Sequence, residues 1–199
     1  MTYGLARLDE LDRVPVAQGL EWRPIRRRLG IAAFGVNAYT AEKPGDWVVE
    51  EHTEERLGHE ELYVVVRGRA RFTLGDEEID APAGTLVFVS DPRLRRVAVA
   101  EEEGTTVMAV GAKPGQAFRP SAWEWYFQAY AQPTDEGIAT LQDGIRTDGE
   151  SGPLYYHLAC LEARAGNDDD ARRHLARAVE LDPSLQAVAA RDDDLKELS

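Results

Sequence analysis

The chain has 199 residues, 43% of them hydrophobic, which is enough for one sizeable core or for a core of about 100 residues with a smaller module attached. It carries 36 acidic and 23 basic residues, and its formal net charge is −13. Such a surface repels phosphate backbones and anionic lipid, which proteins bind through Lys and Arg, so we expect neither nucleic acid nor a membrane surface as a partner.

The compartment is predicted from the N-terminus and from cysteine usage. The first residues, MTYGLARLDELDR, are charged throughout and lack the apolar core of a signal peptide, and no stretch approaches the length of a membrane span. Cys160 is the single cysteine, which excludes an intrachain disulfide and agrees with a reducing compartment. We therefore expect a cytoplasmic protein.

Three segments follow one another along the chain. Residues 1–20 contain only a weak amphipathic stretch and are predicted to form an N-terminal arm. Residues 21–116 consist of short β-branched and aromatic runs broken by turn signals such as KPGD and APAG, which indicates an all-β sandwich or barrel. Residues 117–199 change to apolar residues at three- and four-residue spacing with acidic residues at the segment starts, which is typical of helices.

The helical segment has an internal frame of large, small and turn residues. The frame consists of Gly152, Tyr155, Leu158, Ala159, Gly166, Ala171, Leu175, Ala178 and Pro183. Its order resembles a tetratricopeptide repeat, in which small residues let two antiparallel helices approach closely. One repeat length earlier, Gly137, Leu141 and Gly144 occupy the second-helix positions of a weaker copy. We therefore expect a TPR-like hairpin module, which with so few repeats leans on the strand segment or on a second subunit.

A different motif lies in the strand segment. In HTEERLGHEELYVVVRG, which begins at His52, Glu61 is followed by six residues and Gly68. Further along, Gly84 is followed by five residues and SDPRLR, which ends at Arg95. The two stretches resemble the two motifs of the cupin superfamily, which contain His-x-His followed by Glu and Gly, and then Gly followed by Pro and His.

The resemblance implies a fold and a site. The fold is a mainly β structure plus α: a cupin-like antiparallel β-barrel (jelly roll) followed by the TPR-like helices. The site is a metal centre inside the barrel, for which the chain offers His52, Glu54, His59 and Glu61. Zn, Fe, Mn or Ni would suit such nitrogen and oxygen ligands.

Two departures from the cupin pattern weaken the metal prediction. Glu54 stands where the second histidine belongs, and Arg95 stands where the histidine of the second motif belongs. Arginine remains protonated and has no lone pair for a metal. Because Arg95 alternates with Val97 and Val99, we expect its side chain to point into the barrel.

An inward Arg95 has three possible roles. It can pair with Glu61 or Glu54 and so replace the charge of a metal. It can bind a small anion at the mouth of the barrel, with Glu61 and Tyr63 as neighbouring ligand-binding residues. Alternatively, the four candidate ligands still hold a metal beside it.

The function predicted from the sequence is non-enzymatic. We expect a small-ligand-binding or assembly protein without a cofactor, and a homodimer in which the helices contact a protein partner or a second copy. The alternative is a metal-dependent cupin enzyme, an oxygenase or isomerase acting on a small anionic substrate.

Overall fold

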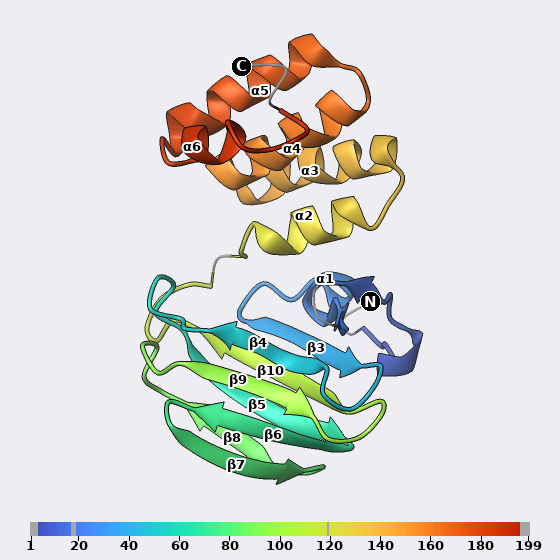
Figure 1. Ribbon diagram of the computed structural model, residues 1–199, viewed down its shortest axis with the longest axis vertical. Helices are drawn as coiled ribbons and strands as arrows, with labels where there is room; N and C mark the ends of the chain where they lie inside the picture. Colours follow the sequence, from blue (N-terminus) through green and yellow to red (C-terminus); the bar gives the residue numbers. More distant parts are fainter. Residues whose placement is uncertain (1–3, 17–18, 119, 196–199) are drawn as a thin grey trace. The chain divides into compact units, whose positions relative to one another are not determined.

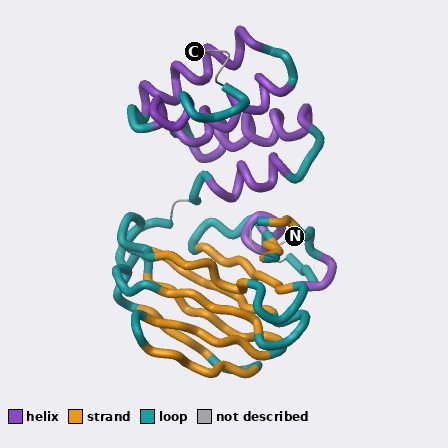
Figure 2. The backbone as a smooth tube through the Cα atoms, viewed as in Figure 1, coloured by secondary structure: helices purple, strands orange, loops and turns teal. Residues whose placement is uncertain are grey.

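The computed structural model describes residues 4–16, 19–118 and 120–195, and the chain divides into two compact units, residues 1–119 and 120–199 (Figure 1). The first unit contains the predicted arm together with the strands, and the described residues of the second form five helices (Figure 2). No helix in the described parts of the chain combines the length and the apolar character needed to cross a membrane.

The strand unit is built mainly from short strands. They are β1 (Val14–Pro15), β2 (Leu20–Arg23), β3 (Gly35–Ala41), β4 (Trp47–His52), β5 (Glu60–Arg67), β6 (Arg69–Leu74), β7 (Glu77–Pro82), β8 (Leu86–Val89), β9 (Arg96–Ala100) and β10 (Thr106–Ala112). A 3₁₀ turn at Leu8–Glu10 precedes them, and the short helix α1 (Ile25–Leu29) lies between β2 and β3. The turns between several strands use glycine with positive φ, as at Gly75 and Gly84, where residues with a Cβ are disfavoured.

The strands form two antiparallel sheets, with the orders β1-β2-β3-β10-β5-β8 and β4-β9-β6-β7. From β3 to β10 the chain passes back and forth between the sheets in the order of a double-sheet jelly roll, and β1 and β2 extend one edge. The antiparallel strands of the sequence prediction are therefore present, but the described residues form two sheets and no closed barrel. This difference arises because strand patterns show which faces are apolar without showing whether the last strand pairs with the first.

The core lies between the two sheets and is filled by a few large side chains opposite small ones. Phe72 on β6 is fully buried, and its ring centroid lies 5.7 Å from that of Tyr63 on β5. Its cross-strand neighbour on β9 is Ala98, which is also fully buried. The interior positions of β9 thus take alanine, because the rings from β5 and β6 occupy the space in front of them.

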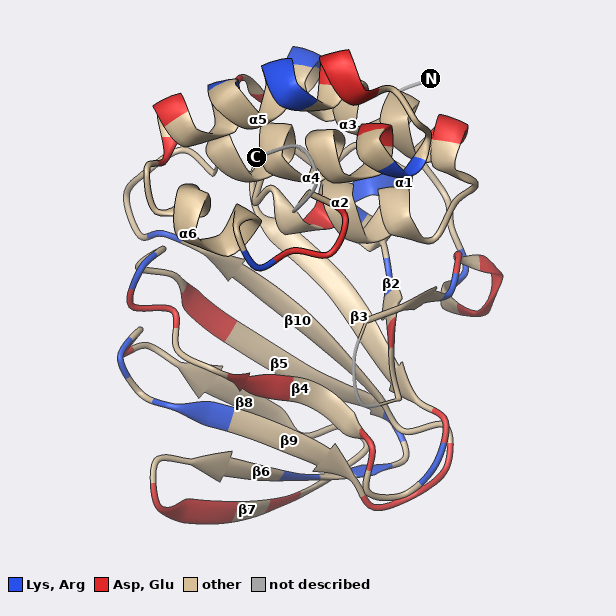
Figure 3. Cartoon of the chain, turned by 45° about the horizontal axis from the view of Figure 1, so that its top comes forward, with Lys and Arg blue, Asp and Glu red and all other residues tan. Residues whose placement is uncertain are grey.

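The strands differ in the charge that they carry. The strands β3, β8 and β10 contain no charged residue, whereas β7 carries Glu77, Glu78 and Asp80, and β6 alternates arginine with apolar residues over its first four positions (Figure 3). On β6 and β7, Arg71 stands opposite Asp80, and Arg69 lies 2.6 Å from Asp80. Such alternation is typical of a sheet with one face in the core and one in water.

The second unit consists of α2 (Trp123–Tyr130), α3 (Thr134–Asp148), α4 (Gly152–Arg164), α5 (Asp168–Leu181) and α6 (Leu185–Ala189). Ser151 caps α4, because its side chain accepts a hydrogen bond from the N–H of Leu154 and Pro153 follows in the first turn. The helices pack through small residues: Ala159 of α4 and Ala171 and Ala178 of α5 are fully buried.

The packing of α3 depends on two glycines, Gly137 and Gly144. A Cβ at Gly137 would lie 2.6 Å from the carbonyl oxygen of Ala129 and 2.9 Å from Cδ1 of Leu161. A Cβ at Gly144 would lie 2.8 Å from the Trp125 ring. The weaker repeat copy therefore marks positions where α3 meets other helices.

Replacing Gly137 with alanine is expected to lower the free energy of unfolding by about 1 kcal/mol. Overpacking against a backbone oxygen costs about 1–3 kcal/mol, and the better helix propensity of alanine returns up to about 1 kcal/mol. Urea unfolding measures the difference, with Gln142→Ala at an exposed position of the same helix as the control. A Gly137→Ala variant at least as stable as the wild type would contradict this close packing.

Candidate functional site

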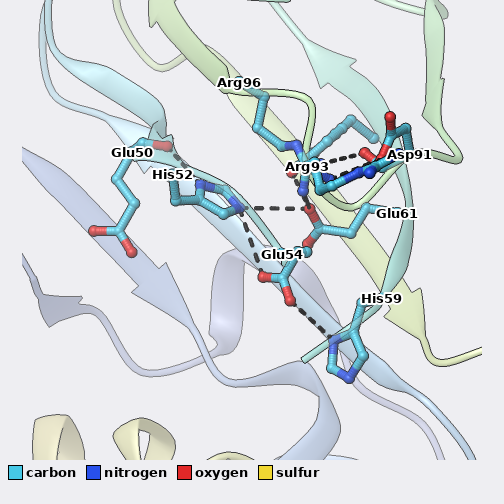
Figure 4. Close-up of polar contacts among 9 residues, drawn as sticks. Glu50, His52, Glu54, His59, Glu61, Asp91, Arg93 and Arg96 are labelled. Atoms are coloured by element: carbon cyan, nitrogen blue, oxygen red, sulfur yellow. Dashed lines mark hydrogen bonds and ion pairs between the residues drawn. The ribbon is translucent and has the colours of Figure 1, made fainter. Parts of the chain in front are cut away.

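A cluster of polar side chains gathers where β4, β5 and β9 meet (Figure 4). His52 is the last residue of β4, Glu54 lies in the following loop, and Glu61 is the second residue of β5. The loop is fixed through its backbone, because the N–H of Glu54 donates to the carbonyl of Pro92 at 2.8 Å. Gly58, with positive φ, then closes a turn by donating its N–H to the carbonyl of Glu54.

His52 is oriented by a backbone contact. Its Nδ1 lies 2.7 Å from the carbonyl oxygen of Glu50, and because a carbonyl only accepts, Nδ1 carries a hydrogen. The other nitrogen, Nε2, then faces two carboxylates: Oε2 of Glu61 at 3.4 Å and Oε1 of Glu54 at 3.7 Å. A lone pair there would oppose both negative charges, so the arrangement favours a proton on Nε2. Burial alone lowers the pKa of His52, but the contacts with Glu61, Glu50 and Glu54 outweigh it and raise that pKa.

Arg96 supplies the buried positive charge of the cluster. Its side chain is 0% exposed, and its guanidinium donates to Oε2 of Glu61 at 3.0 Å and to the carbonyl of Asp91 at 3.1 Å. The hydroxyl of Tyr63 donates to the same oxygen of Glu61. Burial and the charge of Glu61 raise the pKa of Tyr63, which keeps the phenol protonated as a donor.

The expectation that Arg95 points into the interior is wrong. Its side chain is 52% exposed, pairs with Glu51 at 3.2 Å and reaches the carbonyl of Gly75. The sequence prediction placed Val97 and Val99 of β9 inside because they are larger. In the structure the alternate positions, Ala98 and Ala100, face the core instead. Arg96 is the residue that sequence reasoning missed, and its alternation with the small residues Ala98 and Ala100 was the available signal.

The structure brings the other predicted site residues together. Nδ1 of His59 lies 3.4 Å from Oε2 of Glu54, and the His59 ring centroid lies 6.1 Å from that of Phe118. His52, Glu54, His59 and Glu61 are all partly buried, with side-chain exposures between 13% and 26%. Of the ligand-binding residues predicted from the sequence, Glu61 and Tyr63 lie in the cluster and Arg95 does not.

The two carboxyl groups of the cluster have opposite surroundings. Glu61 faces His52, Tyr63 and Arg96, and although burial acts against it, these groups lower the pKa of Glu61. Oε2 of Glu54 is buried without a hydrogen bond from the residues that the structure describes. Burial, followed by the charge of Glu61, raises the pKa of Glu54 to about 7. At neutral pH one carboxyl is therefore charged and the other is partly protonated.

The donor set suits a transition metal in type but not in arrangement. Atoms of His52, Glu54 and Glu61 lie within 4.8 Å of one another, which is a spacing that three ligands of one ion can have. However, Oε2 of Glu61 already accepts from Arg96 and from Tyr63. A divalent ion bound at this oxygen would displace these donors, and at either oxygen of Glu61 it would lie beside the charge of a guanidinium that has no access to water. The cluster as built does not fit a tightly held metal.

Comparisons with known proteins give structural likeness only. No protein-family model matches the chain, and no curated protein matches it at a significant level. Among solved structures, KdgF from Halomonas sp. is 18% identical, with 61% of this chain and 99% of that chain covered and a TM-score of 0.47. An RmlC-like cupin from Shewanella frigidimarina is 16% identical, covering 58% and 94%, with a TM-score of 0.44.

A third structure is a sugar phosphate isomerase of the cupin superfamily, from Silicibacter pomeroyi. It is 18% identical, covers 55% of this chain and 76% of its own, and has a TM-score of 0.45. Two of the three proteins are thus described as cupins. The assignment of motif residues in this chain rests on its own sequence and on the geometry of the cluster.

Glu54→Gln is expected to change the pH dependence of stability. A carboxyl whose pKa is raised by folding binds its proton more tightly in the folded state. The free energy of unfolding therefore falls as the pH rises from about 4.5 to about 7, and it is constant above that. The glutamine variant lacks this fall, so it should be more stable than the wild type at pH 8 by about 1–2 kcal/mol. This figure lies below about 1.4 kcal/mol per pKa unit, because part of the site is open to water.

Urea unfolding at pH 4 and pH 8 tests this expectation. Glu55→Gln, one residue away in the same exposed loop, is the control and should change little at either pH. A Glu54→Gln variant whose difference from the wild type is the same at both values would show that Glu54 titrates like an ordinary carboxyl.

Proposed function

We propose that the cluster of His52, Glu54, His59, Glu61, Tyr63 and Arg96 is a small-molecule site that works by proton transfer, without a tightly bound metal. The observation that carries the proposal is the unequal pairing of the two carboxyls. Glu61 accepts from Arg96 and Tyr63, lies beside His52 and remains charged. Glu54 faces only the imidazoles of His52 and His59, at 3.7 and 3.4 Å, and its buried Oε2 accepts no hydrogen bond from the described residues. Two carboxyls kept in different protonation states are the usual arrangement for acid–base work.

Each residue has a distinct role. Glu54 exchanges the proton: as a carboxylate it accepts one from the bound molecule, and as a carboxylic acid it returns it. His52, held by the Glu50 carbonyl, donates through Nε2. Glu61 keeps His52 protonated and is itself held by Arg96 and Tyr63, which are buried and orient it without reaching the ligand.

The charge of the cluster suggests the class of ligand. With His52 and Arg96 positive, Glu61 negative and Glu54 protonated, the net charge is one positive unit, and it becomes zero when Glu54 ionises. The site therefore favours small molecules that carry a carboxylate or several hydroxyl groups. An anion should bind more tightly at pH 6 than at pH 8, because it stabilises the protonated form of Glu54.

A ligand screen tests the proposal. Small sugars, nucleosides and hydroxy acids are added at pH 6 and pH 8, and thermal unfolding reports binding. We expect at least one compound to raise the melting temperature of the wild type and of Arg95→Gln, which changes an exposed side chain, more at pH 6 than at pH 8. Glu54→Gln, which is neutral at both pH values, should bind that compound without this pH dependence. For that compound, calorimetry in two buffers of different ionisation enthalpy should show uptake or release of a proton.

Three results separate the alternatives. A ligand that binds Glu54→Gln with the same pH dependence and the same proton exchange as the wild type would contradict the role given to Glu54. Binding with no proton exchange and no turnover of any compound would favour the non-enzymatic function predicted from the sequence. Stoichiometric Zn, Fe, Mn or Ni retained through dialysis with a chelator would favour the metal-dependent enzyme.

A further inference from the structure

Asn37 on β3 is a buried amide whose carbonyl oxygen has no hydrogen-bond donor. The residue is 6% exposed, and its Oδ1 accepts no hydrogen bond from the residues that the structure describes. Burial of an amide without a partner costs free energy, and native proteins pair nearly all of their buried polar groups. Asn37 also lies outside both motif stretches of the sequence. It is therefore a candidate for contact with a bound molecule.

The strand register places the side chain of Asn37 between the two sheets. Asn37 stands opposite Ala109 on β10, and Ala109 stands opposite Tyr63 on β5. Side chains directly opposite one another lie on the same side of a sheet. Tyr63 belongs to the core and donates to Glu61, and Ala41, which alternation puts on the same side of β3 as Asn37, belongs to the core too. The amide of Asn37 thus points into the interior, on the side of the sheet from which Glu61 projects.

Small residues separate Asn37 from the candidate site. On β10 the inward positions here are Ala109 and Gly111, and Gly111 stands opposite Glu61. Neighbouring strands lie about 4.8 Å apart, so Asn37 on β3 is about 10 Å from β5, with β10 between them. Ala109 is only partly buried although it packs against the core. At this end of β10 nothing larger than a methyl group projects into the interior.

The candidate site contains a second buried oxygen of the same kind. Oε2 of Glu54 accepts no hydrogen bond from the described residues either. Amide and carboxylate oxygens are both acceptors, so a ligand satisfies them only by bringing donors. A carboxylate group brings none, whereas a hydroxyl group donates to either oxygen. Because a site with unpaired acceptors discriminates strongly against ligands without donors, these two oxygens favour a molecule with several hydroxyl groups.

We infer that Asn37 selects the ligand of this site, by accepting a hydrogen bond from a hydroxyl group while another part of the molecule lies at Glu54. The inference rests on the proposed function, because it concerns the same site. It narrows the ligand class to polyhydroxy compounds such as sugars, sugar acids and nucleosides. Asn37 binds the molecule, and proton transfer stays with Glu54.

The stability of the ligand-free protein gives the first test. Asn37→Leu keeps most of the volume of the side chain, and Asn37→Ala adds no atom to it. Each removes a buried oxygen that lacks a donor, so at least one of them should have a urea midpoint no lower than that of the wild type. If both variants were less stable than the wild type, the amide would support the fold and the inference would be wrong.

Ligand binding gives the second test. Ribose, glucose, gluconate and uridine are used as hydroxylated probes, and acetate as an anion without hydroxyl groups. Titration calorimetry measures their binding to the wild type, to the Asn37 variants and to Asn167→Ala, which changes an exposed asparagine whose side chain caps no helix. We expect at least one hydroxylated probe to bind the wild type and Asn167→Ala, and to bind both Asn37 variants at least about tenfold more weakly, which corresponds to one hydrogen bond.

The outcomes separate this inference from the proposed function. A hydroxylated probe that binds the Asn37 variants as tightly as the wild type, with the same pH dependence, would overturn the inference and leave the proposed function intact. Binding of acetate without binding of any hydroxylated probe would do the same, because the site would then recognise an anion. If none of the probes bound the wild type, the result would count against both.

Discussion

Replacing Arg96 with methionine is expected to lower the free energy of unfolding by about 3–5 kcal/mol. The substitution keeps much of the apolar volume but removes the guanidinium that donates to Glu61 and to the carbonyl of Asp91. A partly buried carboxylate is then left without its strongest partner, and loss of one member of a buried ion pair has a cost of this size. Urea unfolding at pH 8 measures the change.

The neighbouring arginine provides a matched control. Arg95→Met removes an exposed guanidinium whose ion pair with Glu51 lies in water, so the loss should not exceed about 0.5 kcal/mol. Glu61 in the Arg96 variant takes up a proton more readily, so the difference from the wild type should shrink as the pH falls through the ordinary range of a glutamate. Equal losses for the two variants would mean that the placement of β9 is wrong.

Phe72→Ala is expected to destabilise the strand unit by about 3–5 kcal/mol. Phe72 fills the space between the two sheets, and removal of a fully buried ring leaves a cavity that its alanine neighbours Ala98 and Ala70 are too small to fill. Because the ring also packs on Tyr63, the variant should weaken the hydrogen bond to Glu61 and raise the pKa of that carboxyl.

Chemical unfolding and a pH titration of the variant measure both effects. Phe34→Ala removes a phenylalanine ring from an exposed position and should lower the free energy of unfolding by less than about 1 kcal/mol. Phe72→Leu should recover most of the stability lost in Phe72→Ala, because it refills much of the cavity. If Phe72→Ala were no more harmful than Phe34→Ala, the core would not lie between the sheets as described.

The sequence located the candidate site well and its buried cation poorly. The motif put His52, Glu54, His59 and Glu61 in one short stretch, and local chain geometry is enough to keep such residues near one another. The face of Arg95 depended on a choice between two alternating sets on β9. In the structure, Phe72 on β6 stands opposite Ala98, so the alanine side of β9 faces the core. The sequence pattern within β9 contains no information about this neighbour on another strand.

For the fold, too, the sequence predicts what depends on neighbouring residues better than what depends on distant ones. Strand positions follow from turn signals and β-branched runs, whereas the order of strands in two sheets depends on pairings between distant segments such as β3 and β10. In the helical unit, Gly137 and Gly144 were marked by the repeat frame, and the structure places both against other helices. The TPR-like and cupin assignments themselves remain predictions from residue patterns.

The backbone hydrogen bond between Glu54 and Pro92 has a consequence for how this protein can change over time. Two loops are joined there by peptide groups, which are the same whatever side chains the loops carry. Glu55 and Leu57 can therefore be exchanged while the carboxyl of Glu54 stays where it is, provided that Gly58 keeps its turn. Arg56 differs, because its positive charge acts to lower the pKa of Glu54. Side chains at the rim of the site can thus change without displacing the carboxyl to which we assign proton transfer.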